Sequence, residues 1–173
     1  MKNGKTAVLR NGVKSDGSAV FENFNLAHEE TDYLLSYPDE NSFDSEKEGQ
    51  FLEQKAESEN EIEIIAFVDG KVAGTAGIEA VGTKYKIKHR AEFGISVLKE
   101  YWGLGIGRAL MKACIKCAKD TGYSQIELTV VAENVRAIEL YQKEGFVEYG
   151  RNPRGFNSRI SGYQEVVYML LSL

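Results

Sequence analysis

The stretch Ala91–Gly107, AEFGISVLKEYWGLGIG, decides the fold of this chain. Its first eight residues predict a buried strand, and the pattern after the glycines predicts a helix that runs to about Asp120. Between the two, Gly103, Gly105 and Gly107 alternate, so backbone N–H groups can point into one concavity with no Cβ in the way. The start of a helix adds unpaired N–H donors and a partial positive charge. Strand, glycines and helix in this order predict a phosphate-binding loop.

The residue after the loop and the spacing of its glycines narrow the choice of ligand. Arg108 places a cation in the first helical turn, where it opposes the helix dipole unless an anion lies nearby. The dinucleotide fingerprint G-x-G-x-x-G fails because Arg108 occupies its third glycine position, and the P-loop fails because neither Lys-Ser nor Lys-Thr follows. The glycines would also allow tight packing of strand on helix, but we favour the phosphate because the three elements occur in the required order.

The rest of the chain predicts strands and helices without a domain boundary. Their order, β-α-α-β-β-β-α-β-α-β-β, predicts a mixed sheet with helices on both faces and a ligand site beyond the carboxyl ends of its central strands. Asp69-Gly70 predicts a two-residue hairpin turn. Thr83–Arg90 is expected to form a ribbon or extended loop with one positive face, and Arg151–Gly162 to form a loop. The expected strands cover residues 5–11, 61–68, 71–81, 91–98, 125–131, 146–150 and 163–171, and the other expected helices cover 16–27, 42–57 and 134–144.

Composition predicts one globular domain without a metal or a membrane span. The 173 residues are 43% hydrophobic and 27% charged, which is typical of a folded domain. No apolar signal segment is visible and no apolar run approaches the roughly 20 residues that cross a bilayer, so we expect a cytoplasmic protein. The net charge of −5 argues against a nucleic-acid partner. Cys114 and Cys117 have metal or redox spacing, but the only histidines are the distant His28 and His89, so we expect core cysteines in a helix.

At the glycine loop the sequence resembles the GNAT superfamily of N-acetyltransferases. The pyrophosphate loop of that family is written (Q/R)-x-x-G-x-(G/A), which Gly105 and Gly107 match, with Trp102 where the Gln or Arg would stand. A second similar segment is N-x-x-A-I-x-L-Y-x-K-x-G-F, from Asn134 to Phe146. The resemblance implies an α/β (α+β mixed) fold in a single N-acetyltransferase domain over residues 1–173. Its sheet would be mixed and largely antiparallel, with six to seven strands flanked by about four helices.

The same resemblance implies transfer of an acetyl group from acetyl-CoA to a primary amine, by direct attack on the thioester. In the family, the pantetheine arm pairs like an extra strand with the backbone of the strand that corresponds to Ala91–Leu98. Tyr141 matches the general acid beside the departing sulfur, although a tyrosine on a helix also fits a core role. The implied cofactor-binding residues are Ile95 and Val97 on the strand, Gly103, Leu104, Gly105, Ile106, Gly107 and Arg108 in the loop, and Asn134 and Ala137 in the second segment.

The reaction also needs a proton acceptor for the amine. A lysine-type amine has a pKa of about 10.4 and is almost wholly protonated at pH 7, so a base or a chain of waters must remove its proton. Glu92 is our candidate base because it lies on the strand that presents the thioester, and an edge carboxylate without a role fits the sequence equally well. The N–H of Ile95 or Val97 is the candidate donor to the thioester oxygen.

In the resembled fold, the first two helices, the loop between them and the final hairpin wall the acceptor pocket. Fourteen acidic residues lie between Glu22 and Glu63, against Lys47 and Lys55, so the acidic part of the chain falls at this pocket. A small cationic amine is therefore one expected acceptor, although an ordinary solvated surface would show the same charges. Glu30, Asp32, Asp39 and Glu40 would help to attract such an amine, and Tyr33 and Tyr37 could line the pocket. Arg151, Arg154 and Arg159 in the late loop could instead receive a carboxylate.

Several alternatives therefore stay open at this point. The acceptor can be a small molecule, an amino acid or a peptide, including a protein N-terminus. A module that binds acyl-CoA without catalysis would need the same loop, and Tyr141 favours the enzyme because binding alone requires no proton donor. A homodimer is compatible with the resemblance.

Overall fold

The computed structural model describes Met1 and residues 4–173. Its seven strands form one mixed sheet in the order β1-β2-β3-β4-β5-β7-β6, and four α-helices flank it, as the sequence predicts. The strands are β1 (Ala7–Asn11), β2 (Ile62–Val68), β3 (Lys71–Ala80), β4 (Arg90–Val97), β5 (Gln125–Val131), β6 (Val147–Ser158) and β7 (Gly162–Ser172). The helices are α1 (Gly17–Glu30), α2 (Ser45–Glu57), α3 (Ile106–Asp120) and α4 (Val135–Lys143), with 3-10 turns η1 (Lys14–Asp16), η2 (Pro38–Glu40) and η3 (Lys99–Tyr101).

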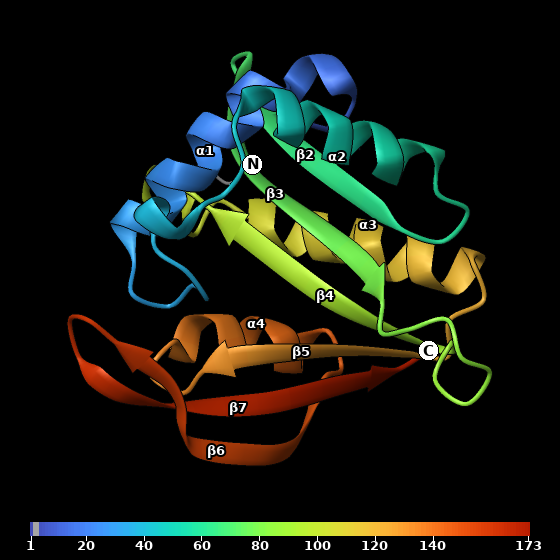
Figure 1. The fold of residues 1–173 in the computed structure, drawn as a ribbon, viewed down its shortest axis with the longest axis vertical. Helices are drawn as coiled ribbons and strands as arrows, with labels where there is room; N and C mark the ends of the chain where they lie inside the picture. Colours follow the sequence, from blue (N-terminus) through green and yellow to red (C-terminus); the bar gives the residue numbers. More distant parts are fainter. Residues whose placement is uncertain (2–3) are drawn as a thin grey trace.

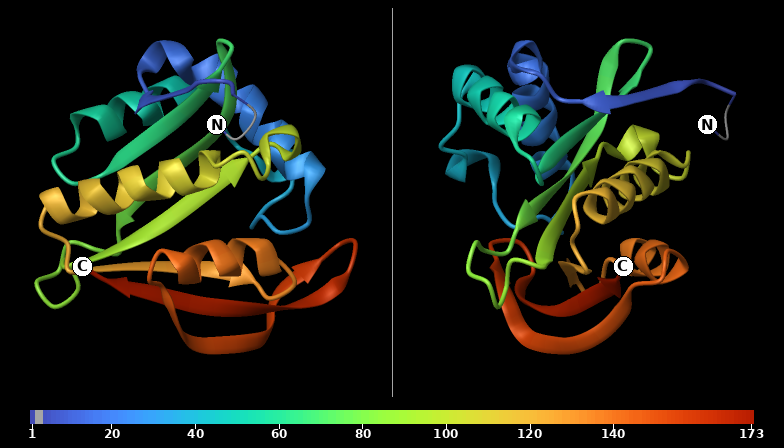
Figure 2. Two further views of the ribbon diagram at one scale, coloured as in Figure 1. Left: turned by 180° about the vertical axis from the view of Figure 1, so that it is seen from behind. Right: turned by 90° about the vertical axis from the view of Figure 1, so that its right-hand side faces the viewer.

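The helices cover both faces of the sheet. Helices α1 and α2 pack on β2, β3 and β4 from one side, and α3 packs on the same strands from the other (Figures 1 and 2). The main core lies on the α3 and α4 side and includes Ile78, Leu110, Met111, Ile126 and Met169. A smaller cluster of Val20, Leu52, Ile65 and Val72 fills the space beneath α1 and α2. Among the described residues, no helix is long and apolar enough to cross a membrane.

Strands β4 and β5 separate part-way along their length. They run parallel and pair at Arg90, Ala91 and Glu92, beyond which Figure 1 shows them diverging. The other edge of β4 pairs antiparallel with β3 along the whole strand. There, the N–H of Leu98 donates to the carbonyl of Ala73, and the N–H of Val81 donates to the carbonyl of Arg90. Because hydrogen-bonded residues alternate along an antiparallel pair, the backbone groups of the even-numbered residues of β4 point toward β3. The backbone groups of the odd-numbered residues after Glu92 therefore face the gap between β4 and β5.

Local turn chemistry sets several element boundaries. Asp69 and Gly70 have φ values of 50° and 78°, which confirms the predicted hairpin turn between β2 and β3. Helix α2 begins at Ser45 rather than at Ser42, because the Asp44 carboxylate accepts from the N–H groups of Glu46 and Lys47. The predicted core position of Cys114 is also confirmed, since that residue is fully buried in α3.

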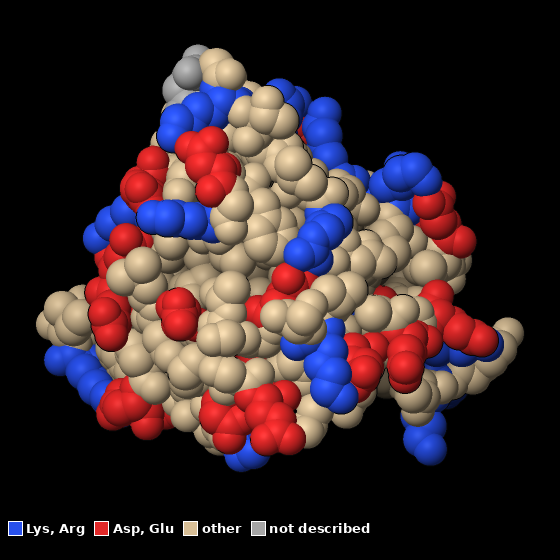
Figure 3. Space-filling model, turned by 90° about the horizontal axis from the view of Figure 1, so that it is seen from above, with Lys and Arg blue, Asp and Glu red and all other residues tan. Residues whose placement is uncertain are grey.

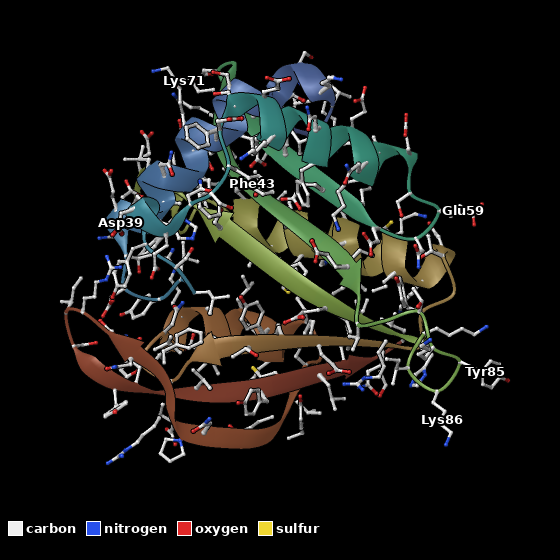
Figure 4. All side chains as sticks on the ribbon, in the orientation of Figure 1. Asp39, Phe43, Glu59, Lys71, Tyr85 and Lys86 are labelled. Carbon is white, nitrogen blue, oxygen red and sulfur yellow. The ribbon has the colours of Figure 1, made fainter. Side chains whose placement is uncertain are left out.

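Two expected loops differ in the structure. Residues 151–162 are mostly strand, because β6 continues to Ser158 and only a tight turn separates it from β7. Gly155 indicated a loop, but it serves close strand approach: a Cβ there would lie 2.2 Å from Val166 Cγ2. Thr83–Arg90 is a series of turns rather than an extended ribbon, with Ile87 and Lys88 N–H both donating to Lys84. Tyr85 and Lys86 point outward from this loop (Figure 4).

The carboxyl of Glu63, a half-buried residue of β2 under α2, makes the stability of the fold depend on pH. Glu63 of β2 packs against Gly77, where a Cβ would lie 2.1 Å from its Oε2. Burial raises the pKa of Glu63 to about 7. A hydrogen bond with Thr75 and the charge of Lys55 lower this pKa, but their effect is smaller than that of burial. Because the ordinary pKa is 4.5, folding takes up a proton between the two values, and stability falls as the pH rises from about 4.5 to about 7.

Glu63→Gln removes this ionisation and should flatten the pH dependence of stability. The difference in unfolding free energy between the variant and wild type should be larger at pH 8 than at pH 4. The increase should be up to about 3 kcal/mol, as the difference between the two pKa values implies. Urea unfolding at both pH values measures the change. Glu59→Gln, at an exposed carboxyl, is the control and should leave the profile unchanged. A Glu63→Gln profile parallel to that of wild type would contradict the prediction.

Candidate active site

The glycine loop joins the end of β4 to the start of α3 with the geometry of an anion-binding loop. Gly103 and Gly105 have φ values of 78° and 95°, in the left-handed region that favours glycine. Gly105 caps α3, and the first N–H of the helix with an intrahelical partner is that of Ala109, which donates to Gly105 at 3.1 Å. The N–H groups of residues 106–108 are thus left as donors at the positive end of α3.

Trp102 holds the end of the unpaired β4 edge. Its indole Nε1–H donates to the carbonyl of Val97 at 2.6 Å. Val97 is one of the two residues whose backbone is expected to pair with the pantetheine arm, so its carbonyl already has one partner. Trp102 is the only tryptophan of the chain, and a half-buried indole usually finds a hydrogen-bond partner. The sequence predicts that the indole N–H of Trp102 has a hydrogen-bond partner, but it does not predict which carbonyl accepts.

Two arginines lie near the loop, and only one of them was a candidate. Arg108 forms an ion pair with Glu144 at the end of α4, so its place in the first turn of α3 already has an anionic partner. Arg136 of α4 was missed: its guanidinium stacks 5.3 Å from the ring centre of Trp102. Its Nη2 lies 3.0 Å from where a Cβ on Gly103 would be, so it places a positive charge over the loop.

Helix α4 brings the second expected segment to the gap between β4 and β5. The Asn134 side chain accepts from Ala137 N–H at 3.3 Å and so caps the helix. Tyr141 is 7% exposed, and its ring packs edge-on against Phe93 of β4 and against Phe146. Burial raises the pKa of Tyr141, which keeps its hydroxyl protonated at neutral pH. Within the described part of the chain, this hydroxyl makes no hydrogen bond.

A cavity of about 570 Å³ opens beside Trp102, on the side of the α1–α2 segment. Of the two candidate tyrosines, Tyr33 lines this cavity and Tyr37 does not. Glu92 also lies outside it among the described residues: its exposed side chain stands where the pairing of β4 with β5 ends. The lining residues are Glu30, Thr31, Asp32, Tyr33, Lys99, Trp102, Glu133, Ser161, Tyr163 and Gln164.

The charged candidates around the cavity are mostly engaged with one another. Figure 3 looks onto the face with α1 and α2, where Asp and Glu side chains gather in groups with Lys and Arg between them. Asp39 and Glu40 are bound by Arg159, and Glu30 Oε2 accepts from Lys99 N–H at 2.7 Å. Two further sequence candidates are also engaged: Arg151 pairs with Glu148 and Glu165, and Arg154 stacks on Tyr163, a residue of the cavity lining. Glu133, which the sequence did not single out, lines the cavity without an ion pair to any described residue.

Comparison with known proteins places this geometry in a family. The model of the acetyltransferase (GNAT) family matches residues 24–146, which include β4, the glycine loop and α4. The chain belongs to the GNAT acetyltransferase family. This GNAT chain is 33% identical over 108 residues to the L-amino acid N-acetyltransferase AaaT of Escherichia coli (strain K12), covering 62% of this chain and 65% of that protein. It thus spans just under two thirds of that curated relative.

Solved structures show the same architecture. The acetyltransferase of the GNAT family from Streptococcus pneumoniae superposes with a TM-score of 0.92 at 30% identity, covering 97% of this chain and 100% of that chain. The acetyltransferase yncA from Salmonella typhimurium, whose structure contains its cofactor acetyl-CoA, superposes with a TM-score of 0.85 at 20% identity. That second match covers 96% of this GNAT chain and 94% of the other. The expected fold is therefore confirmed.

Two glycines of the loop should respond differently to a methyl group. Gly107 lies in α3, and a Cβ there would make ordinary contacts, 3.5 Å from Leu140 and 3.8 Å from Ile95. Gly107→Ala should therefore keep or raise stability by up to about 1 kcal/mol. Because the methyl would stand beside the β4 edge where it meets the helix start, binding of coenzyme A should weaken about tenfold or more, measured by calorimetry.

Gly105→Ala is the matched variant, since its φ of 95° strains any side chain while nothing lies within 4 Å of the new methyl. Its unfolding free energy should fall by about 1–2 kcal/mol. If Gly107→Ala binds coenzyme A as tightly as wild type does, the ligand does not use the start of α3.

Proposed function

We propose that residues 1–173 form one N-acetyltransferase domain that transfers the acetyl group of acetyl-CoA to a small cationic amine. One observation carries the proposal: the unpaired backbone edge of β4 runs without interruption from the glycine loop into the opening between β4 and β5. An extended amide-bearing arm could pair with this edge as a further strand does. The thioester at its end would then lie near Tyr141 and the amine cavity.

Acetyl-CoA would be held by backbone groups over most of its length. The N–H groups of Gly103–Arg108 supply donors to the pyrophosphate, and Arg136 adds charge above the loop. The pantetheine amides would pair with the backbone of Ile95 and Val97, sharing the Val97 carbonyl with Trp102. Leu104 and Ala137 would flank this path as apolar neighbours, with Asn134 fixing the start of α4.

Acid–base groups on the two faces of β4 suit direct transfer. A neutral amine attacks the thioester carbonyl, whose oxygen takes the negative charge and would accept from Ile95 or Val97 N–H. Collapse of this intermediate breaks the carbon–sulfur bond, and the departing thiolate takes a proton from the Tyr141 hydroxyl. The side chain of Glu92 stands on the opposite face of β4 from Phe93 and its neighbour Tyr141. Glu92 would take the proton of the amine directly or through water.

The lining of the cavity supports a cationic acceptor. Three carboxylates, Glu30, Asp32 and Glu133, face one lysine, Lys99. A module that binds acyl-CoA without catalysis would show the same loop and cavity. The two functions are distinguished by thiol release from acetyl-CoA during incubation with polyamines, amino acids, aminoglycosides and peptides. Coenzyme A binding without thiol release from any acceptor would favour the binding module.

Tyr141→Phe tests the acid. The phenylalanine ring keeps the packing against Phe93 and Phe146, so coenzyme A affinity and stability should stay close to wild type. Without the hydroxyl, kcat should fall by about a hundredfold, the usual contribution of a general acid. Tyr149→Phe removes the hydroxyl of an exposed tyrosine and is the control. Unchanged kcat in Tyr141→Phe would overturn the assignment.

Glu133→Gln tests the charge of the acceptor. Its carboxylate lines the cavity and is free of ion pairs with described residues, so its removal should raise KM for a diamine about fivefold, a loss of about 1 kcal/mol. The KM for a monoamine of equal length should change less, and the effect should shrink at high salt. Glu139→Gln, on the outer surface of α4, should leave both KM values unchanged. Equal effects on both amines would contradict a charge-selective cavity.

A further inference from the structure

The two walls of the cavity are tied together by a set of hydrogen bonds and ion pairs that we term the clasp. One wall is the segment between α1 and α2, and the other is the tip of the β6–β7 hairpin, more than a hundred residues later. In Figure 4, Asp39 lies just above the hairpin tip. The members of the clasp are Asp32, Tyr37, Asp39 and Glu40 on the first wall and Ser158, Arg159, Ser161 and Gln164 on the second.

Asp32 is the centre of the inner half of the clasp. Its carboxylate accepts from Ser158 Oγ at 2.7 Å and from Ser161 Oγ at 2.8 Å, and its backbone carbonyl accepts from Gln164 Nε2 at 3.0 Å. Although burial would raise the pKa of Asp32, the hydrogen bonds from Ser158, Ser161 and Tyr37 leave it below its usual value. Ser158 and Gln164 are buried. The carboxylate is thus fully engaged across the gap between the walls.

Arg159 forms the outer half. Its guanidinium binds both oxygens of Asp39, at 2.7 and 2.8 Å, and lies 4.4 Å from the centre of the Tyr37 ring. Its backbone N–H donates to the Tyr37 hydroxyl at 2.8 Å. A single surface ion pair contributes little, but here one guanidinium holds both Asp39 and Glu40, and its residue is joined through Tyr37 to the part-buried hydrogen bonds of Asp32. The two halves meet at Tyr37, whose hydroxyl also donates to Asp32.

From this geometry, and resting on the function proposed above, we infer that the acceptor is a small amine bound in the cavity, which the clasp closes on one side, and not the N-terminus or a lysine of a polypeptide. A polypeptide needs an exit from the site for the chain beyond the acetylated residue, because each extended residue adds about 3.3 Å of chain. The clasp joins the walls where such a chain would leave. The cavity of about 570 Å³ is within the range of small-molecule sites.

The test compares acceptors of graded length. Thiol release is measured with a free small amine and with the same amine as the N-terminal group of a dipeptide and of an octapeptide. For wild type, kcat/KM should fall about tenfold or more from the small amine to the octapeptide. Arg159 and Tyr37 both lie outside the cavity lining. Arg159→Ala and Tyr37→Phe should each reduce the ratio of kcat/KM for the small amine to kcat/KM for the octapeptide about fivefold. The kcat/KM for the small amine itself should stay within about twofold of wild type.

Arg151→Ala is the matched control, because Arg151 lies on the same hairpin and pairs with Glu148 and Glu165 away from the clasp. It should leave the ratio at its wild-type value. A wild-type enzyme that acetylates the octapeptide as well as the small amine would overturn the inference. So would a ratio that stays unchanged in both clasp variants.

A second measurement separates failure of the clasp from failure of the proposed function. Absence of thiol release with every acceptor would reject the transferase itself. Amide hydrogen exchange then tests, without any acceptor, whether the clasp is formed in solution. The N–H groups of Arg159, Ile160 and Ser161 all donate to the side-chain hydroxyl of Tyr37 or Ser158. Their exchange should quicken about tenfold or more in Tyr37→Phe. Rates equal to wild type would show that the clasp does not hold the walls together.

Discussion

Beyond Glu92, the odd-numbered residues of β4 carry N–H and C=O groups that β5 does not pair. An unpaired backbone group next to a core is costly unless water or another partner satisfies it, so an opening of this kind persists only where the surroundings enforce it. The ring of Tyr141, on α4, packs against Phe93 of β4 and against Phe146, which precedes β6, and so adds packing on one side of the opening. Trp102 satisfies the last carbonyl of the edge, that of Val97.

The separation of β4 and β5 also explains the long C-terminal hairpin. Having left β4, β5 pairs along its whole length with β7, which in turn pairs with β6. Bulges near Gly150 and Pro153 let β6 follow the twist, and the hairpin extends far enough for its tip to reach the α1–α2 segment. The opening in the sheet and the wall that faces it are therefore two consequences of one strand arrangement.

Short-range patterns predicted more of the molecule than long-range pairs did. The glycine loop, the Asp69-Gly70 turn and the cap at Asn134 depend on neighbours in the chain, and all three lie where the sequence predicts. Arg108 was interpreted through the helix dipole, but its partner Glu144 is 36 residues away. The pairing of Arg159 with Asp39, 120 residues apart, is equally invisible in the sequence. Such partners are chosen by the fold, and composition cannot name them.

The negative charge of the cavity lining agrees with the sequence prediction, but it comes partly from a residue that the prediction did not include. The acidic segment from Glu22 to Glu63 suggested carboxylates free to attract a cation, yet Asp32 and Asp39 are bound within the clasp. The guanidinium of Arg159 compensates the charge of Asp39, whereas the neutral donors around Asp32 stabilise its carboxylate without cancelling its charge. Among the described residues that line the cavity, Glu133 is the carboxylate with neither an ion pair nor a hydrogen bond, and it lies outside that segment, between β5 and α4. In the proposed function, attraction of a cation would therefore draw on Glu133 as well as on Glu30 and Asp32, while Asp39 and Glu40 of the acidic segment bind Arg159 and fasten the wall.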